Sequence, residues 1–138
     1  MRAWLFTIKV NAAIFTTSVN SCGWTRVEIT FATTKLESVF ETDKARVREF
    51  GAERARRLIV RLTQLRDAEH LEQMRVLPGR CHELHGDRHG QLAIDVTKNY
   101  RLIFNPAVDP PPTKADGGLD WSAVDAITIL EVEDYHGD

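Results

Sequence analysis

The sequence predicts an α+β fold, in which an N-terminal strand and a helical hairpin precede an antiparallel β-meander that packs on the helices. Residues 27–31 alternate apolar and polar side chains, which is the period of a half-buried strand. Apolar residues recur at helical spacing through residues 43–66, and beyond Pro78-Gly79 the pattern changes to short strands bounded by turn residues. Helices followed by a run of strands are typical of this fold class.

The helical part begins with a short stretch around residues 36–40 and continues with residues 43–50, which end at Gly51 in a C-cap position. The following helix has an apolar stripe that we expect in the core: Ala55, Leu58, Ile59, Leu62 and Leu65. Its arginines are expected to face mainly outward: Arg54, Arg56, Arg57, Arg61 and Arg66.

The strand half is predicted from alternation and from turn residues. Residues 81–84 form a strand and residues 86–90 a loop, after which Leu92, Ile94 and Val96 alternate with Gln91, Ala93 and Asp95. Residues 100–104 follow a turn at Lys98-Asn99. Residues 106–120 contain four prolines and are a surface loop. The closing strand, residues 126–132, leads to Asp134, Tyr135 and His136.

The chain of 138 residues fits one domain, which we place at residues 27–138. Residues 1–26 carry no acidic side chain, hold two of the three tryptophans and show no sustained period, so we expect an N-terminal extension that is non-native or disordered. This segment matches a transit peptide only weakly. Because coherent patterning starts at Val27, and valine can be encoded by the bacterial start codon GUG, we hypothesise that translation begins there.

Cysteine content and hydropathy indicate a cytoplasmic protein. Cys22 and Cys81 lie far apart and form no metal-type pair, which favours a reducing compartment. No run of residues approaches the length of a membrane span, so we expect no membrane partner.

Charge is distributed unevenly along the chain. Residues 44–101 hold 13 basic and 8 acidic residues, a net charge of +5, whereas residues 102–138 hold one basic and 8 acidic residues, a net charge of −7. This asymmetry is consistent with an anionic partner on one surface and a basic partner on another, or simply with solvated faces.

Histidines concentrate in the strand half, where four of the five occur: His82, His85, His89 and His136. Alternation places Arg101 on the face of its strand opposite to Tyr100 and Leu102, where it is available to an anion. Two imidazoles near a cation suggest phosphodiester cleavage, because histidine can act as general base or general acid near neutral pH. RNA supplies its own 2′-hydroxyl nucleophile, so this chemistry requires no metal and no cofactor.

Zinc binding is the main chemical alternative, since Cys81, His82, His85 and His89 are close in sequence. Residues 82 and 85 of a strand point to opposite faces, however, and no matching second ligand pair is visible. The sequence therefore predicts no metal site.

The order of three motifs resembles the RelE/ParE superfamily of bacterial type II toxins, and within it the HigB branch, also called plasmid-maintenance killers. The motifs are Gly79-Arg80-Cys81-His82-Glu83-Leu84-His85-Gly86-Asp87-Arg88-His89-Gly90-Gln91, then Tyr100-Arg101-Leu102-Ile103-Phe104, and finally Glu133-Asp134-Tyr135-His136. Each motif is weak alone, but their order, spacing and terminal placement together are specific. The resemblance covers about residues 27–136.

The resemblance implies a ribosome-dependent mRNA endoribonuclease that is neutralised by a helix-turn-helix, HigA-like antitoxin and meets operator DNA only through that antitoxin. It assigns the proton transfers to His82 and His136 and the scissile phosphate to Arg101. Asp134 would orient an imidazole or contact RNA. Positions matching RNA contacts in the family are His85, Arg88 and Tyr135.

One residue departs from the family pattern, because His85 stands where some relatives have lysine and a neutral imidazole does not replace an ammonium group. Residues 27–138 also carry 15 basic and 20 acidic residues, a net charge of −5 that is unusual for an RNA-binding protein. Two alternatives therefore stay open. One is a non-catalytic inhibitor of the gyrase-poisoning type, and the other is a degenerate member that only binds its antitoxin.

Overall fold

The computed structural model describes residues 27–134, so the predicted extension of residues 1–26 and the side chains of Tyr135 and His136 lie outside the described residues. The strands are β2 (Glu28–Phe31), β3 (His82–Glu83), β4 (Leu92–Asp95), β5 (Tyr100–Pro106) and β6 (Ala126–Asp134). The α-helices are α2 (Thr34–Glu41), α3 (Asp43–Phe50) and α4 (Ala52–Asp67). The short 3-10 helices are η1 (Leu71–Val76), η2 (Gly86–Arg88) and η3 (Trp121–Ala123).

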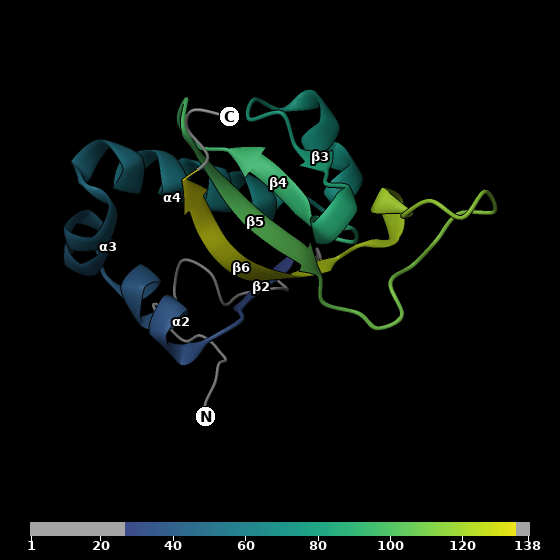
Figure 1. The fold of residues 1–138 in the computed structure, drawn as a ribbon, viewed down its shortest axis with the longest axis horizontal. Coiled ribbons are helices and arrows are strands. Elements are labelled where there is room, and N and C mark those ends of the chain that lie inside the picture. The colour runs from purple at the N-terminus through teal and green to yellow at the C-terminus, as the bar shows by residue number, and fades with distance from the viewer. Residues whose placement is uncertain (1–26, 135–138) are drawn as a thin grey trace.

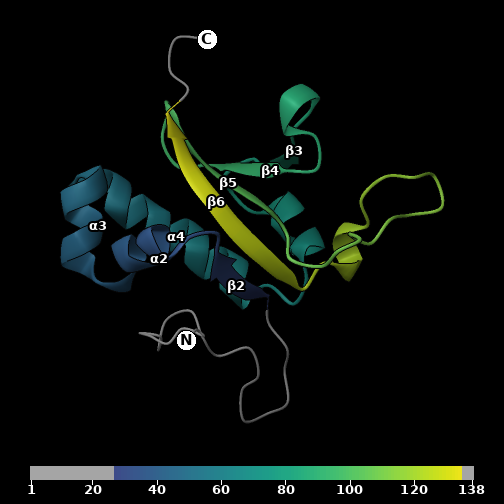
Figure 2. The ribbon, with the colours of Figure 1, turned by 60° about the horizontal axis from the view of Figure 1, so that its bottom comes forward.

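The predicted α+β fold is confirmed: an N-terminal strand and helices precede a mostly antiparallel sheet. The five strands of residues 27–134 lie in the order β2-β6-β5-β4-β3, and β2 runs parallel to β6 while the other neighbours are antiparallel. The helices gather on one side of the sheet, with α4 lying across it and α2 and α3 beyond its edge (Figures 1 and 2). Within residues 27–134, the opposite face of the sheet carries no α-helix.

Two threonine caps and one glycine divide residues 34–67 into three helices. Thr33 accepts a hydrogen bond from the backbone N–H of Leu36, and Thr42 accepts one from Ala45, so each threonine begins a helix. Gly51, with a φ of 87°, ends α3 as predicted and leads directly into α4. The predicted helical hairpin corresponds to α3 and α4.

The main core lies between α4 and the sheet. Leu58, Leu62 and Leu65 of α4 are fully buried and belong to one apolar cluster with side chains of the sheet: Ile29, Leu92, Ile94, Leu102, Phe104, Ile127 and Ile129. These are the residues that helical spacing and strand alternation place on the inner faces. A second, smaller cluster on the other face of the sheet consists of Leu84, Ala93 and Ile103, with Leu130 packed against it.

Three local predictions need correction. Ala93, which alternation places on a polar face, is fully buried because the second cluster covers it. Pro106 is the last residue of β5 and not the first of the loop. Arg61 does not simply face solvent, since its Nε donates to the backbone carbonyl of Asp95 at 2.8 Å and its burial lowers its pKa.

Two further buried side chains, Arg46 and Trp121, attach neighbouring segments to each other. Arg46 of α3 is buried and donates from Nη1 to the carbonyl of Phe40, which joins α3 to the end of α2. Trp121 is buried, lies 3.8 Å from the guanidinium of Arg75 and donates from Nε1 to Glu83 at 2.8 Å. The long loop that ends at Trp121 is thereby attached to β3.

Among residues 27–134, no helix is both long and apolar enough to cross a membrane.

Candidate functional site

Polar side chains collect on the face of the sheet that the α-helices leave uncovered. Leu102 belongs to the main core, and Tyr100 packs against it, whereas Arg101 lies between them in β5 and points to the other face. This confirms the predicted orientation of Arg101. In the antiparallel register its partner on β6 is Glu133. The next pair whose side chains point to the same face is Ile103 with Glu131.

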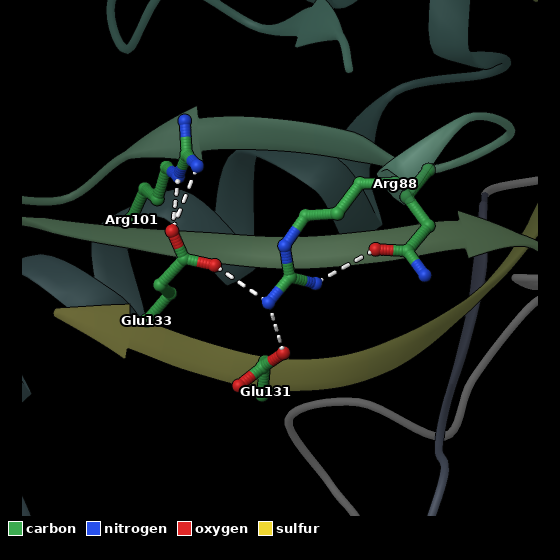
Figure 3. Close-up of polar contacts among 5 residues, drawn as sticks. Arg88, Arg101, Glu131 and Glu133 are labelled. Carbon is green, nitrogen blue, oxygen red and sulfur yellow. Dashed lines mark hydrogen bonds and ion pairs between the residues drawn. The ribbon is translucent and has the colours of Figure 1, made fainter. Parts of the chain in front are cut away.

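Two arginines and two glutamates form a connected group, called here the Arg–Glu cluster: Arg88, Arg101, Glu131 and Glu133. Arg101 donates from Nη2 at 2.7 Å and from Nε at 3.2 Å to the same carboxylate oxygen, Oε2 of Glu133. Glu133 lies between the two guanidiniums, as Figure 3 shows. Arg101 was predicted to be available to an anion, and in this structure a carboxylate of the same chain occupies it.

Arg88 reaches the cluster from η2, in the connection between β3 and β4. Its Nη2 donates to Oε2 of Glu131 at 2.8 Å, and its Nη1 donates to the side-chain oxygen of Gln91 at 2.9 Å (Figure 3). Oε1 of Glu133 lies 2.7 Å from Nη2 but accepts no hydrogen bond from it, so that contact is purely ionic. The hydrogen bond to Glu131 raises the pKa of Arg88 above its ordinary value.

The irregularity of the β5–β6 ladder decides which residues of β6 face the cluster. The register shifts between Ile103 and Phe104, so that Ile129 pairs with Phe104 on the core side while Glu131 pairs with Ile103 on the open side. Beyond the shift the ordinary alternation of a strand puts Glu131 and Glu133 on one face. Both acids are thus brought to Arg88 and Arg101.

A third arginine forms a separate ion pair on the same face. Arg80 contacts Asp95 at 2.7 Å, and Asp95 pairs across the strands with Arg101. The three arginines and three carboxylates carry no net charge together. The basic excess of residues 44–101 therefore does not produce a positively charged surface here.

His82 lies in β3 on this face. In the strand register it is opposite Ala93 of β4, and Ala93 is in turn opposite Ile103 of β5, which faces the open side. Its Nδ1 is 2.6 Å from the backbone carbonyl oxygen of Arg80. A carbonyl can only accept, so Nδ1 carries the proton and Nε2 is the nitrogen left with a lone pair in the neutral ring. His82 is thus held in the tautomer that a general base with Nε2 requires.

The backbone before His82 is strained in a way that produces this contact. Arg80 has a φ of +50°, which is uncommon for a residue with a side chain, and Gly79 has a φ of +114°. The carbonyl of Gly79 accepts from the N–H of Asp95 at 2.6 Å, which attaches the turn to β4. The turn directs the carbonyl of Arg80 to the ring of His82.

Replacing Gly79 with alanine is expected to lower the free energy of unfolding by about 2–4 kcal/mol. An added Cβ would lie 2.7 Å from Cγ1 of Ile94, in addition to the strain of a positive φ. Gly51→Ala is the matched control, because its φ is also positive but no atom lies within 4 Å of the added Cβ. Urea unfolding measures both, and equal losses for the two variants would show that the close approach to Ile94 is unimportant.

The other predicted histidine of this motif is less constrained. His85 is exposed and precedes η2, and its side chain makes no capping hydrogen bond. Within the described part of the chain, no group of three or more histidine, cysteine or acidic side chains is arranged to hold a metal ion. His82 therefore lies in β3, whereas His85 lies in the connection that leads from β3 to β4.

Asp134 lies on a different face from Arg101. It pairs with Tyr100, whose ring packs toward the helices, whereas the neighbouring pair of Arg101 and Glu133 points to the open face. Of the predicted site residues, the structure therefore brings Arg88 and Arg101 together and places His82 on their face. Asp134 is separated from them, and Tyr135 and His136 lie outside the described residues.

Cys81, immediately before His82, is a structural thiol. Its side chain packs against the main core although part of the residue remains accessible, and burial raises its pKa to about 12. The neutral thiol is thereby favoured in the folded state. Burial of the neutral Cys81 thiol therefore favours the folded protein fully at pH values below about 8.5, the pKa of the thiol in the unfolded chain. This contribution to the free energy of unfolding is lost as the pH rises toward 12.

At pH 8.5, alkylation of Cys81 by iodoacetamide is expected to be at least about 30-fold slower in the folded protein than in urea, because only the thiolate reacts. The experiment uses a Cys22→Ser variant, in which Cys81 is the single thiol. Equal rates in the two states would contradict the assigned burial.

The arrangement can bind an oxyanion. Two guanidiniums that converge on one carboxylate offer the planar donor geometry that also suits a phosphodiester. A histidine with a defined lone pair lies on the same face. The acids Glu131 and Glu133 were not predicted as site residues, although their spacing of two in the closing strand places them on one face and was a usable signal.

Comparison with known proteins identifies the family. The family model of the HigB-like toxins, described as RelE-like toxins of the type II toxin-antitoxin system HigB, matches residues 29–109. Among solved structures, the chain is similar to a YoeB/ParE toxin from Agrobacterium tumefaciens, with 9% sequence identity and a TM-score of 0.46, over 78% of this chain and 98% of that one. No curated protein matches the chain. The predicted RelE-like, HigB-type resemblance is confirmed.

Proposed function

The chain belongs to the HigB-like toxin family of type II toxin-antitoxin systems, and on this premise we propose that it is a ribosome-dependent mRNA endoribonuclease. A type II toxin has a protein antitoxin as its partner. The observation that carries the proposal is the convergence of Arg88 and Arg101 on one carboxylate of the open face. A carboxylate held in this way supports the assignment of the two arginines to the scissile phosphate.

In the proposed reaction the 2′-oxygen of the substrate attacks the adjacent phosphorus. The new O–P bond forms as the bond from phosphorus to the 5′-oxygen breaks, which leaves a 2′,3′-cyclic phosphate upstream and a 5′-hydroxyl downstream. The base takes the 2′-hydroxyl proton, and an acid donates a proton to the leaving 5′-oxygen. Every proton and bond is accounted for without a metal ion.

His82 is suited to the role of general base. Its Nδ1 donates to the carbonyl of Arg80, which leaves Nε2 to accept the 2′-hydroxyl proton. Arg101, supported by Arg88, stabilises the charge that develops on the phosphorane oxygens. These contributions require only side chains of the open face.

The remaining roles fall to the end of the chain and to the β3–β4 connection. His136 is the proposed general acid, Tyr135 stacks on a base, and Asp134 orients an imidazole or contacts RNA. His85 is a proposed RNA contact. The antitoxin is proposed to be a helix-turn-helix protein of the HigA type, which alone contacts operator DNA, and a ribosomal substrate implies a cytoplasmic location.

Expression of the full chain without antitoxin, with growth followed and transcript 5′ ends mapped, tests the proposal. His136→Ala is the catalytically inactive comparison, with equal protein levels verified by immunoblotting. Growth arrest with codon-phased new 5′ ends, absent in the variant, is the expected result. DNA breaks without transcript cuts would instead indicate a gyrase inhibitor. Normal growth at a verified protein level would indicate a degenerate member.

A further inference from the structure

Among residues 27–134, three arginines of the open face, Arg80, Arg88 and Arg101, are each occupied by a carboxylate of the same chain. Arg88 and Arg101 share Glu133, Arg88 also binds Glu131, and these contacts are 2.7–2.8 Å long. We propose that Glu131 and Glu133 are specificity-determining residues that close the arginine site to free RNA, so that only mRNA positioned by the ribosome is a substrate. The inference rests on the proposed nuclease function and adds the choice of substrate to it.

Arg101 cannot hold the carboxylate of Glu133 and the phosphate of an RNA strand with the same two donors at the same time. Arg101 uses Nε and Nη2, the edge that would hold a phosphodiester in bidentate fashion, for Oε2 of Glu133. Arg88 uses one nitrogen, Nη2, for both glutamates. An approaching phosphate must displace Glu133 or lie against its negative charge.

Electrostatics strengthen this exclusion. The side chains of Arg101 and Glu133 are each only 20% exposed, so salt and water screen their interaction less than that of an ordinary surface pair. The Arg–Glu cluster contains two positive and two negative charges, and the Arg80–Asp95 pair beside it is also neutral. These six described side chains therefore supply no net positive charge of the kind that draws nucleic acid to a binding surface from a distance.

The same arrangement accounts for a dependence on the ribosome. A strand held on the ribosome reaches the site at a high effective concentration and in a fixed orientation, so it competes with Glu133 without long-range attraction. A free strand in solution has neither advantage. The two acids thus act on binding rather than on the chemical step.

The test measures binding of free RNA to the full chain by fluorescence anisotropy. The probe is a labelled 12-nucleotide RNA with 2′-O-methyl groups throughout, which cannot be cleaved by 2′-hydroxyl attack. Glu131→Gln/Glu133→Gln is compared with Glu28→Gln/Glu41→Gln, which changes the net charge equally at two exposed acids outside the cluster. We expect about 10-fold or greater tightening for the first variant and less than about 3-fold for the second.

Two further variants secure the interpretation. Glu131→Gln alone, at a side chain that is 48% exposed, is expected to fold normally and to give a smaller gain. Adding Arg88→Ala to the double glutamine variant is expected to remove most of the gain. Equal affinities of the cluster and control variants would overturn the inference, as would a loss of cleavage without tighter binding.

Cleavage of ribosome-bound mRNA by the unmodified protein, measured with the same samples, separates this inference from the proposed function. Cleavage without a gain in affinity for the cluster variant refutes only the role of the glutamates. Absence of cleavage refutes the nuclease proposal itself and the inference with it.

Discussion

Arg101→Ala is expected to slow cleavage of ribosome-bound mRNA by about 100-fold or more, because a guanidinium that meets the developing phosphorane charge is lost. The side chain lies on the open face of β5, and its donors already converge on one anionic oxygen, that of Glu133. Single-turnover cleavage of an mRNA paused on purified ribosomes measures the effect.

Two variants test whether the loss is specific. Arg101→Lys keeps the charge but not the two parallel donors, so it should retain more activity than alanine while remaining well below arginine. Arg80→Ala removes an arginine of the same face that belongs to a separate pair with Asp95, and its rate should stay within about threefold of the unmodified protein. A rate for Arg101→Ala within threefold as well would exclude Arg101 from the reaction.

Phe104→Ala is expected to lower the free energy of unfolding by about 3–5 kcal/mol, since it leaves a large cavity in the core. Phe104 belongs to β5, and its fully buried side chain lies in the core on the α4 side of the sheet. It pairs with Ile129 of β6 at the register shift. A loss of this size is a large part of the stability of an ordinary domain. Urea unfolding followed by circular dichroism measures it.

Phe104→Leu is the control for this prediction, because it retains most of the buried volume and should cost clearly less than alanine. The alanine variant should also lose the alignment of Glu131 and Glu133 if it folds, since the shift beside Phe104 directs both acids to the open face. A loss below about 1 kcal/mol for alanine would show that this position is not central to the core.

Local periodicity was sufficient to predict most of the fold. The apolar stripe of α4 and the alternation in β2 and β5 reflect burial on one face, which is a property of neighbouring residues. The parallel pairing of β2 with β6 joins residues about 100 positions apart, and no local pattern specifies it. Burial of Ala93 likewise depends on a second apolar cluster whose members come from different segments.

The site was predictable to a smaller extent. Strand alternation predicted to which face of the sheet Arg101 points. It did not predict that Glu133 is its partner, because that pairing depends on the register of β5 against β6 and on the shift beside Ile103. Asp134 was grouped with Arg101 because both match site positions of the family that the sequence resembles, and strand register places Asp134 on the other face. The contact of His82 with Arg80 required a left-handed backbone at a residue that is not glycine, for which the sequence gives no signal.

The chemistry of the fragment ends tests the central claim most directly. The full chain is added to purified ribosomes translating one defined mRNA, and the 3′ end of the upstream fragment is identified. Attack by the 2′-hydroxyl predicts a 2′,3′-cyclic phosphate upstream and a 5′-hydroxyl downstream, in fragments that are absent without ribosomes. A 3′-hydroxyl paired with a 5′-phosphate, or no cleavage at all, would contradict the account.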